Sequence, residues 1–382
     1  MDARPERPVT DAAFEETAER FVASRLPEIL AEITTTLRSV RRGITRCGLL
    51  VCSADGTHVR SWSDSNGQVI ECPPAHCTIE PGSVLARARQ EPDQGVHPST
   101  RDRFLEWCSG DAHRTLLVLS VRGANEYYGY LVIETGSADR SRKAHDALQS
   151  AALPAWARLA ANAVGGAIRT IRMLVGAVRF ARDFTLMRDR ETGEHQLRLG
   201  AYLQVLADEM RSARDLSEGL ARELTLFGPL HDIGKIGIAD DVLLKPGRFD
   251  EAEWIAMKRH VDKGRALVRH MSQDLSLEGM PGLETLASVV AHHHEYLDGS
   301  GYPEGLRASD IPLASRMVTV VDIFDALTCI RPYKRSWQID EAFAHLEGLS
   351  GDKIDRDCFR AMHAARTRFG EIWRSFHPHP AT

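Results

Sequence analysis

The sequence predicts an α+β protein of several domains: an N-terminal α/β domain, a long linker helix and a C-terminal all-α domain. Strand–turn–strand patterns occur in the first 135 residues, whereas apolar residues beyond residue 190 recur almost throughout at helical spacing. The chain has 382 residues, enough for two or three domains. Of its 16 histidines, 11 lie beyond residue 190, so we expect the two halves to carry different chemistry.

The overall composition is that of an ordinary globular protein, with 43% hydrophobic and 26% charged residues. A net charge of -5 gives no indication of nucleic-acid binding. The first residues are polar and charged, unlike a secretory signal, and no apolar run is long enough to span a bilayer. We therefore expect a reducing cytoplasm, with neither membrane nor nucleic acid among the partners.

The N-terminal half begins with a polar stretch, residues 1–24, which is predicted to be a disordered or helical tail. Helical apolar spacing follows over 21–40, although it contains one proline. Residues 47–62 are predicted to form a strand, an Asp-Gly turn and a second strand. A short helix and loop are predicted over 79–93, and two strands joined by a Gly-Ala-Asn turn over 114–135.

This order of helix, strands, excursion and closing hairpin resembles a GAF-type sensor domain, over residues 25–141. The resemblance implies a sensor but leaves its ligand open: a cyclic nucleotide, a haem, a small metabolite or none. Cysteines and histidines in this half could indicate redox or metal chemistry, but their irregular spacing favours ordinary core or surface residues. They are Cys47, Cys52, Cys72, Cys77, Cys108, His58, His76, His97 and His113.

Residues 142–188 carry no strong strand signal and are predicted to form a linker helix. Six apolar residues in it alternate in spacings of three and four, which is typical of a coiled-coil seam. They are Val164, Ala167, Ile171, Leu174, Val178 and Ala181. One interpretation is a helix packed on its own domain. The other, which we favour, is a homodimer through two parallel linker helices.

Residues 189–375 are predicted to form an all-α domain, followed by a tail over 376–382. Helical apolar spacing occurs over 194–213, 215–230, 251–271, 282–297, 313–330, 339–349 and 356–375.

Histidines and carboxylates form a series along these predicted helices. Glu191 and His195 share one helix face if the helix reaches back that far. His260 alone would more often be structural than a ligand, whereas Asp322 lies in an apolar helix, where a buried carboxylate needs a partner. A mixed nitrogen and oxygen set suits iron, manganese or zinc rather than calcium. The series is Glu191, His195, His231, Asp232, His260, His293, His294 and Asp322.

Three longer motifs occur in the same order: HDIGK at 231–235, HHEYLDGSGYP at 293–303 and DIFDALTCIRPYK at 322–334. With them the sequence resembles, over residues 185–365, an HD-GYP domain of the HD superfamily of metal-dependent phosphohydrolases. The family register selects His293 and His294 as ligands and leaves His292 outside.

The resemblance implies that the whole series binds a di- or trinuclear centre, with iron or manganese favoured and Asp232 bridging two ions. Glu191 decides between two ions and three, because some family members carry a glutamate there and hold three. We expect three; the alternative is a solvated acidic residue at a helix start. His231, Asp232 and Lys235 are the expected catalytic residues.

The implied reaction is hydrolysis of cyclic di-GMP to linear pGpG, with further cleavage to GMP left open, in bacterial second-messenger signalling. Lys235, Arg331 and Lys334 are the expected phosphate contacts, although the last two could instead cap a helix end. Tyr302 would line the substrate pocket or pack in the core. Asp298 would order its loop or support a ligand histidine. Diguanylate-cyclase domains are candidate partners.

Two departures from the family pattern touch no ligand: Ile354-Asp355-Arg356 in place of Phe-Asp-Pro, and Ile238-Ala239 in place of Ile-Pro. Two alternatives remain for the function. A receptor of cyclic di-GMP without turnover would not need so complete a ligand set. A mononucleotide phosphohydrolase would not need the Gly-Tyr-Pro loop or the Arg-Pro-Tyr-Lys stretch.

Overall fold

The chain divides into two compact units. The sheet unit is Val22–Met173, and the helical unit comprises Met1–Phe21 with Leu174–Thr382. Among the residues that the structure describes, no helix combines the length and hydropathy that a bilayer crossing needs. The computed structural model describes residues 9–40, 43–53, 55–73, 77–91, 103–109, 115–123, 127–135, 152–188, 190–213, 216–280, 282–329 and 336–376.

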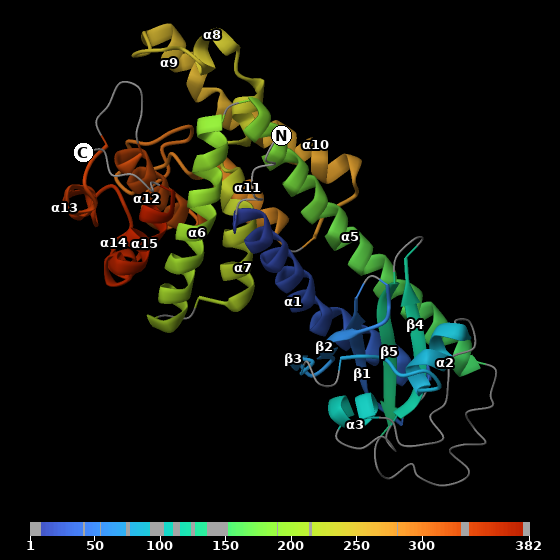
Figure 1. The fold of residues 1–382 in the computed structure, drawn as a ribbon. Coiled ribbons are helices and arrows are strands. Elements are labelled where there is room, and N and C mark those ends of the chain that lie inside the picture. The colour runs from blue at the N-terminus through green and yellow to red at the C-terminus, as the bar shows by residue number, and fades with distance from the viewer. Residues whose placement is uncertain are drawn as a thin grey trace, which may run out of the picture. The chain divides into compact units, whose positions relative to one another are not determined.

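The sheet unit is built on a five-stranded antiparallel sheet in the order β3-β2-β1-β5-β4 (Figure 1). The strands are β1 (Ile44–Cys52), β2 (Val59–Asp64), β3 (Val69–Glu71), β4 (Thr115–Arg122) and β5 (Tyr127–Thr135). The helices that contribute to this unit are α1 (Val9–Val40), α2 (Val84–Gln90), α3 (Arg103–Ser109) and α5 (Ala152–Arg188). The two predicted strand pairs are therefore present, whereas β3 and α3 lie outside the elements predicted from the sequence.

Both faces of the sheet are covered by helices. On one face, Leu30 of α1 and Val164 of α5 pack on Leu131 of β5. On the other, side chains of α2 and α3 pack around Trp62. Gly48 lies against this tryptophan, since a Cβ on Gly48 would be 1.8 Å from the indole ring. The sheet is therefore a buried layer, as expected where helices cover both of its faces.

Four of the five cysteines discussed for this half, Cys47, Cys52, Cys72 and Cys108, are buried, and none of them forms a disulfide. Burial raises the pKa of Cys47 to about 11 and that of Cys52 to about 12, so these thiols stay protonated. Their position supports the interpretation as core residues. His58 is exposed, and three histidines lie outside the described residues: His76, His97 and His113.

The predicted linker is helical from Ala152 to Arg188, while residues 142–151 lie outside the described part. The central residues of the predicted seam are already covered within one chain. Ile171, Leu174 and Val178 expose 3%, 0% and 2% of their surface. This favours the interpretation in which that seam packs on its own chain.

The helical unit contains the rest of the described elements. They are α6 (Arg190–Ala213), α7 (Glu218–Phe227), η4 (Gly228–Leu230), η5 (Ile233–Gly237), α8 (Asp240–Leu243), α9 (Glu251–Lys258), α10 (His260–Asp274), α11 (Leu283–His292), η6 (Ala308–Asp310), α12 (Leu313–Thr328), α13 (Ile339–Leu349), α14 (Arg356–Ala364) and α15 (Arg366–Phe376).

Three predicted helices differ from the structure in extent. The helix expected over 251–271 breaks at Arg259 into α9 and α10, and that expected over 356–375 breaks at Ala365. The helix expected over 282–297 ends at His292, so His293 and His294, the two histidines predicted as ligands, follow the helix rather than lie within it. The buried apolar residues keep their helical spacing on both sides of each break. The spacing therefore could not predict where these helices are interrupted.

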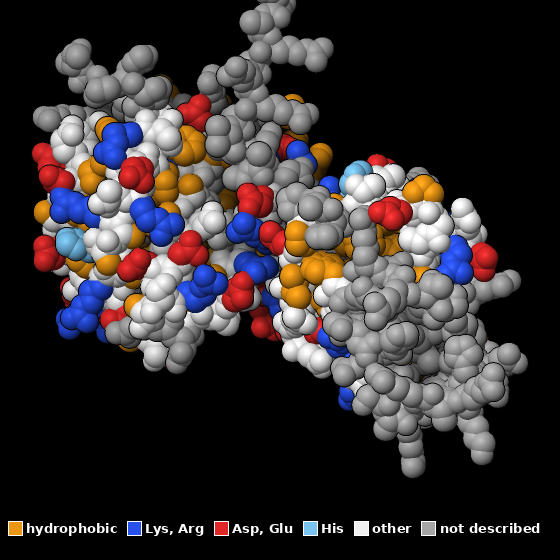
Figure 2. Space-filling model, turned by 60° about the horizontal axis from the view of Figure 1, so that its bottom comes forward, with side chains coloured by type: hydrophobic (Ala, Val, Ile, Leu, Met, Phe, Trp, Pro, Cys, Tyr) orange, Lys and Arg blue, Asp and Glu red, His pale blue; other side chains and the backbone are white. Residues whose placement is uncertain are grey.

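Stacked aromatic rings fix the helix that carries Asp322. Tyr202 of α6 stacks on Phe369 of α15, with centroids 4.9 Å apart, and meets Phe324 of α12 edge-on at 5.4 Å. All three side chains are fully buried. On the face of this unit drawn in Figure 2, Lys and Arg side chains are interspersed with Asp and Glu.

Candidate metal centre

The His-Asp dipeptide lies in a tight turn between η4 and η5, pressed against the start of α10. Gly234 permits this approach, because a Cβ there would lie 1.8 Å from the His260 carbonyl oxygen and 2.5 Å from the Gly264 nitrogen. Backbone atoms cannot move aside as a flexible side chain can. The glycine of HDIGK therefore allows His231 and Asp232 to meet His260.

Four histidines each donate one ring proton to a fixed acceptor. The Nδ1 atoms of His231, His260 and His293 lie 2.8–3.0 Å from carbonyl oxygens of their own helical turns. Nδ1 of His195 lies 2.7 Å from Oδ2 of Asp325. A carbonyl or carboxylate oxygen can only accept, so Nδ1 carries a proton, and in the neutral ring Nε2 then keeps its lone pair.

These lone pairs converge. Nε2 of His195 is 3.4 Å from Nε2 of His231, and Nε2 of His260 is 3.4 Å from Nε2 of His293. Two lone pairs at this distance do not hydrogen-bond; a cation between them would satisfy both. Oδ1 of Asp232 is likewise buried without a hydrogen-bond donor. The donor set therefore fits the metal centre that the sequence predicts.

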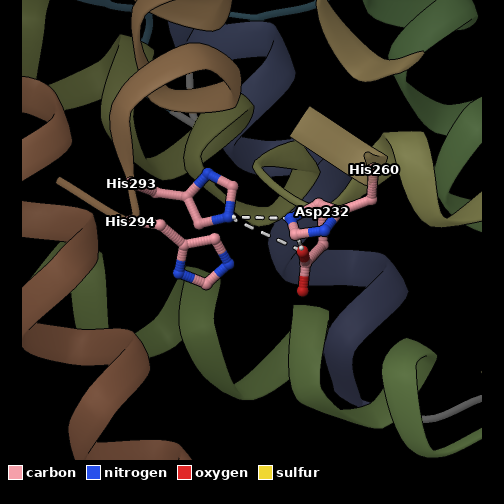
Figure 3. Close-up of side chains that lie close together, drawn as sticks. All are labelled: Asp232, His260, His293 and His294. Atoms are coloured by element: carbon pink, nitrogen blue, oxygen red, sulfur yellow. Dashed lines mark hydrogen bonds and ion pairs between the residues drawn. The ribbon is translucent and has the colours of Figure 1, made fainter. Parts of the chain in front are cut away.

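The ligand atoms form two groups (Figure 3 shows the first). One comprises Asp232, His260, His293 and His294, and the other His195, His231 and Asp322. Asp232 faces both. Its Oδ1 lies 3.2 Å from Nε2 of His260, and its Oδ2 lies 3.3 Å from Nε2 of His231. Asp232 therefore lies between the two groups.

The pKa shifts mostly favour the metal-binding protonation states. Burial lowers the pKa of His260 to about 4 and that of His294 well below its usual value, so both rings are neutral. Burial alone would raise the pKa of Asp232, but Lys235 and His231 outweigh it and hold that pKa well below its usual range. His231 is the exception, because the contact with Asp232 outweighs burial and raises its pKa.

Asp325 is a residue beside the site for which the sequence predicted no role. It is 2% exposed, and besides His195 it accepts two hydrogen bonds from Arg198, at 2.7 and 2.9 Å. A carboxylate behind a ligand histidine fixes the ring and makes Nε2 a better donor. The sequence contained an indication of this role, because Asp325 lies one helical turn after Asp322 and is part of the same motif.

Glu295 is a second residue without an assigned role. Its buried carboxylate accepts from the backbone nitrogens of Glu304 at 2.7 Å, Gly305 at 3.1 Å and Leu306 at 3.0 Å. It thus closes the Gly-Tyr-Pro loop onto the end of α11. Asp298 accepts from the Ser300 nitrogen at 2.8 Å, so the expectation that it orders the loop is confirmed.

Tyr302 lies beside the first ligand group. Its ring stacks on that of His294, with centroids 4.6 Å apart and an interplanar angle of 29°, and it is half-buried. Lys235 Nζ lies 2.6 Å from Oδ2 of Asp232. Both expected substrate contacts therefore border the cluster. His292 is absent from both ligand groups, as the register implied.

The remaining predicted residues are only partly described. Helix α6 begins at Arg190, so it does reach back to Glu191, one turn before His195. The side chain of Glu191 lies outside the described part of the chain, as do Arg331 and Lys334.

Comparison with known proteins assigns this fold. Residues 185–358 match the HD domain family, so the C-terminal half is a helical HD domain. A cyclic di-GMP phosphodiesterase of Thermotoga maritima is 38% identical over 187 residues, which are 49% of this chain and 48% of that protein.

Two further relatives match over stretches of similar length. The cyclic di-GMP phosphodiesterase response regulator RpfG of Xanthomonas campestris is 38% identical over 189 residues, which are 50% of this chain and 47% of that protein. The 3'3'-cGAMP-specific phosphodiesterase 3 of Vibrio cholerae is 37% identical over 174 residues, which are 46% of this chain and 35% of that protein. The chain thus spans half or less of the length of the curated relatives it matches.

Proposed function

We propose that the HD domain hydrolyses cyclic di-GMP to pGpG, with GMP as a further product to be tested. The observation that carries this proposal is the convergence of imidazole Nε2 lone pairs on Asp232, whose buried Oδ1 lacks a hydrogen-bond donor. A receptor that only binds the dinucleotide needs no such set.

The seven residues of the two groups would hold the metal ions, for which we propose iron or manganese, with Glu191 as the ligand of a third. Such a centre supplies positive charge that lowers the pKa of a coordinated water and polarises a phosphodiester. The residues of the chain prepare the site. The Nδ1 bonds orient the imidazoles of His195, His231, His260 and His293. Burial keeps His260 and His294 neutral, and Lys235 holds Asp232 in its charged form.

Removing one ligand tests this assignment. We expect His231→Ala or Asp232→Ala to abolish hydrolysis of cyclic di-GMP and to lower bound metal, because each removes donor atoms from the cluster. The matched control is His292→Ala, which removes a neighbouring histidine outside both groups and should change neither quantity. Full activity with unchanged metal content in His231→Ala would refute the site. Metal analysis of Glu191→Ala distinguishes three ions from two.

A second substrate has specific support, because one relative is named as specific for 3'3'-cGAMP. Cyclic GMP-AMP differs from cyclic di-GMP in one base, so the metal groups cannot discriminate between the two. Hydrolysis rates on cyclic di-GMP, 3'3'-cGAMP and mononucleotides would rank the three candidate substrate classes. Arg331 and Lys334 remain proposed phosphate contacts.

We also propose that the sheet unit is a GAF-type sensor that regulates the HD domain. The support is its antiparallel sheet, covered on one face by α1 and α5 and on the other by the inserted α2 and α3. An absorption spectrum of purified protein would show whether it carries a haem or another chromophore.

Finally, we propose a homodimer through α5, but through a face other than the predicted seam. The large apolar residues of α5 that stay exposed are Trp156, Leu159, Met173, Phe180, Phe184 and Met187.

A further inference from the structure

Lys258 lies outside the two ligand groups but is linked to them through the ring of Tyr302. Tyr302 stacks on His294, and Nζ of Lys258 lies 4.8 Å from the centroid of the Tyr302 ring. The same Nζ lies 5.5 Å from the centroid of Trp254, which is 45% exposed. The row His294, Tyr302, Lys258, Trp254 thus connects the buried ligands with the protein surface.

The charge of Lys258 is oriented without being neutralised. Two other lysines of this region are ion-paired: Lys235 with Asp232 at 2.6 Å and Lys245 with Glu253 at 2.5 Å. Within the described part of the chain, no carboxylate forms an ion pair with Lys258. Aromatic faces within about 6 Å attract an ammonium group but cancel none of its charge. The ammonium group of Lys258 is therefore not engaged by a carboxylate of the described residues and can contact an external anion.

The surroundings hold this lysine in place. It ends α9, which starts with a capping box between Asp250 and Glu253. The backbone nitrogen of Tyr302 donates to the His294 carbonyl at 3.1 Å, so the ring below Lys258 is anchored to the ligand segment. A charge fixed before binding loses less freedom when the ligand arrives, and this increases affinity.

We propose that Lys258 binds the second phosphate of a cyclic dinucleotide, the one that is not being cleaved. This rests on the proposed function of the metal groups. A cyclic dinucleotide joins two phosphates in one ring, and the metal groups suit the scissile one. Lysine serves as a point charge, which suits a phosphate whose orientation differs between substrates. A diester with a single phosphate offers nothing for Lys258 to bind.

The test compares Lys258→Met with the wild type on cyclic di-GMP and on bis(p-nitrophenyl) phosphate. Methionine retains an apolar, unbranched side chain without the charge. We expect KM for cyclic di-GMP to rise roughly tenfold to a hundredfold, as for one lost charged contact, with kcat nearly unchanged. Hydrolysis of the small diester and metal content should stay as in wild type. Lys258→Arg should restore most of the affinity.

Lys245→Met is the matched control, since it removes a lysine of the same region whose charge is already paired with Glu253. It should leave KM unchanged. An unchanged KM in Lys258→Met, or an equal loss on both substrates, overturns the inference. A wild type that binds cyclic di-GMP in calorimetry but does not hydrolyse it would refute the reaction alone. Weaker binding by Lys258→Met would then still support the subsite. A wild type that does not bind refutes both.

Discussion

At the scale of single residues, four of the five candidate ligand histidines are oriented by a hydrogen-bond acceptor behind the ring. For His231, His260 and His293 that acceptor is a backbone carbonyl three or four residues earlier. For His195 it is the side chain of Asp325, on another helix. His195 is therefore the ligand whose orientation a single substitution can alter without touching the backbone.

We expect Asp325→Asn to weaken metal binding about 10- to 100-fold, because asparagine keeps the shape but supplies no charge to polarise His195. Competition with a chelator for Mn²⁺ measures the affinity. Burial would raise the pKa of Asp325, but His195 and Arg198 outweigh it, so the wild-type carboxylate stays charged to well below neutral pH. Asp340→Asn, on the exposed start of α13, is the control. Equal metal affinity in both variants would mean that Asp325 serves Arg198 alone.

The sequence could predict the candidate ligands, seven of which the structure brings together in two groups, but not what orients them. A series of histidines and carboxylates in a known order is visible as letters, and so was Asp325 within its motif. A carbonyl acceptor cannot be recognised in a sequence, because every residue has a backbone carbonyl. Only the fold decides which carbonyl lies beside a histidine ring. Glu295 shows the same limit. It stands next to His294 in the sequence, yet its partners are the backbone nitrogens of Glu304, Gly305 and Leu306.

At the scale of elements, the turn after His231 and the Gly-Tyr-Pro loop bring the candidate ligands together. Each contains a glycine that lies directly against the backbone of another segment. Gly234 lets the turn after His231 approach α10. Gly301 lets its loop fold onto the segment that follows α11, since a Cβ there would lie 2.5 Å from the Glu295 Cα. Both glycines were visible in the motifs. The segments that they contact could not be predicted, because these are distant in the sequence or lie on the other side of a loop.

We expect Gly234→Ala to destabilise the helical unit by about 1–3 kcal/mol or more, since overpacking against backbone cannot relax by a rotamer change. Thermal unfolding and metal content measure the effect. Gly348→Ala is the control: it lies within α13 with nothing within 4 Å of its virtual Cβ. Alanine should stabilise that helix by about 0.5–1 kcal/mol. Equal melting temperatures for the two variants would contradict the close approach at Gly234.

At the scale of the whole molecule, α5 carries two apolar stripes shifted by one residue. The predicted seam begins at Val164, and a second stripe alternates in the same spacings of three and four. That stripe consists of Trp156, Leu159, Ala163, Gly166, Thr170, Met173, Ala177, Phe180, Phe184 and Met187. One residue rotates a helix by about 100°, so the two stripes face different directions. Periodicity alone could not show which stripe packs on its own chain. The burial of the side chains shows that it is the predicted seam.

The exposed stripe is long enough to hold a second copy. Its six large side chains expose between 44% and 87% of their surface, with Phe180 at 72% and Met187 at 87%. Covering about 100 Å² on each would bury roughly 1,200 Å² across two chains, the lower end of stable interfaces. Gly166 and Thr170 leave the middle of the stripe weak. The aromatic end, where Phe180 stacks on Phe184 at 6.3 Å, should therefore contribute most.

We expect Phe180→Lys to convert a dimer to a monomer, because a charge in the aromatic end of the exposed stripe must be desolvated twice in a parallel pair. Light scattering gives the mass, and circular dichroism checks the fold. Phe180→Leu keeps an apolar seam residue and should stay dimeric. Leu174→Lys places the same charge in the buried stripe and should lower the melting temperature instead. If Phe180→Lys keeps the wild-type mass, the exposed stripe is not the interface, and a second chain must pair elsewhere.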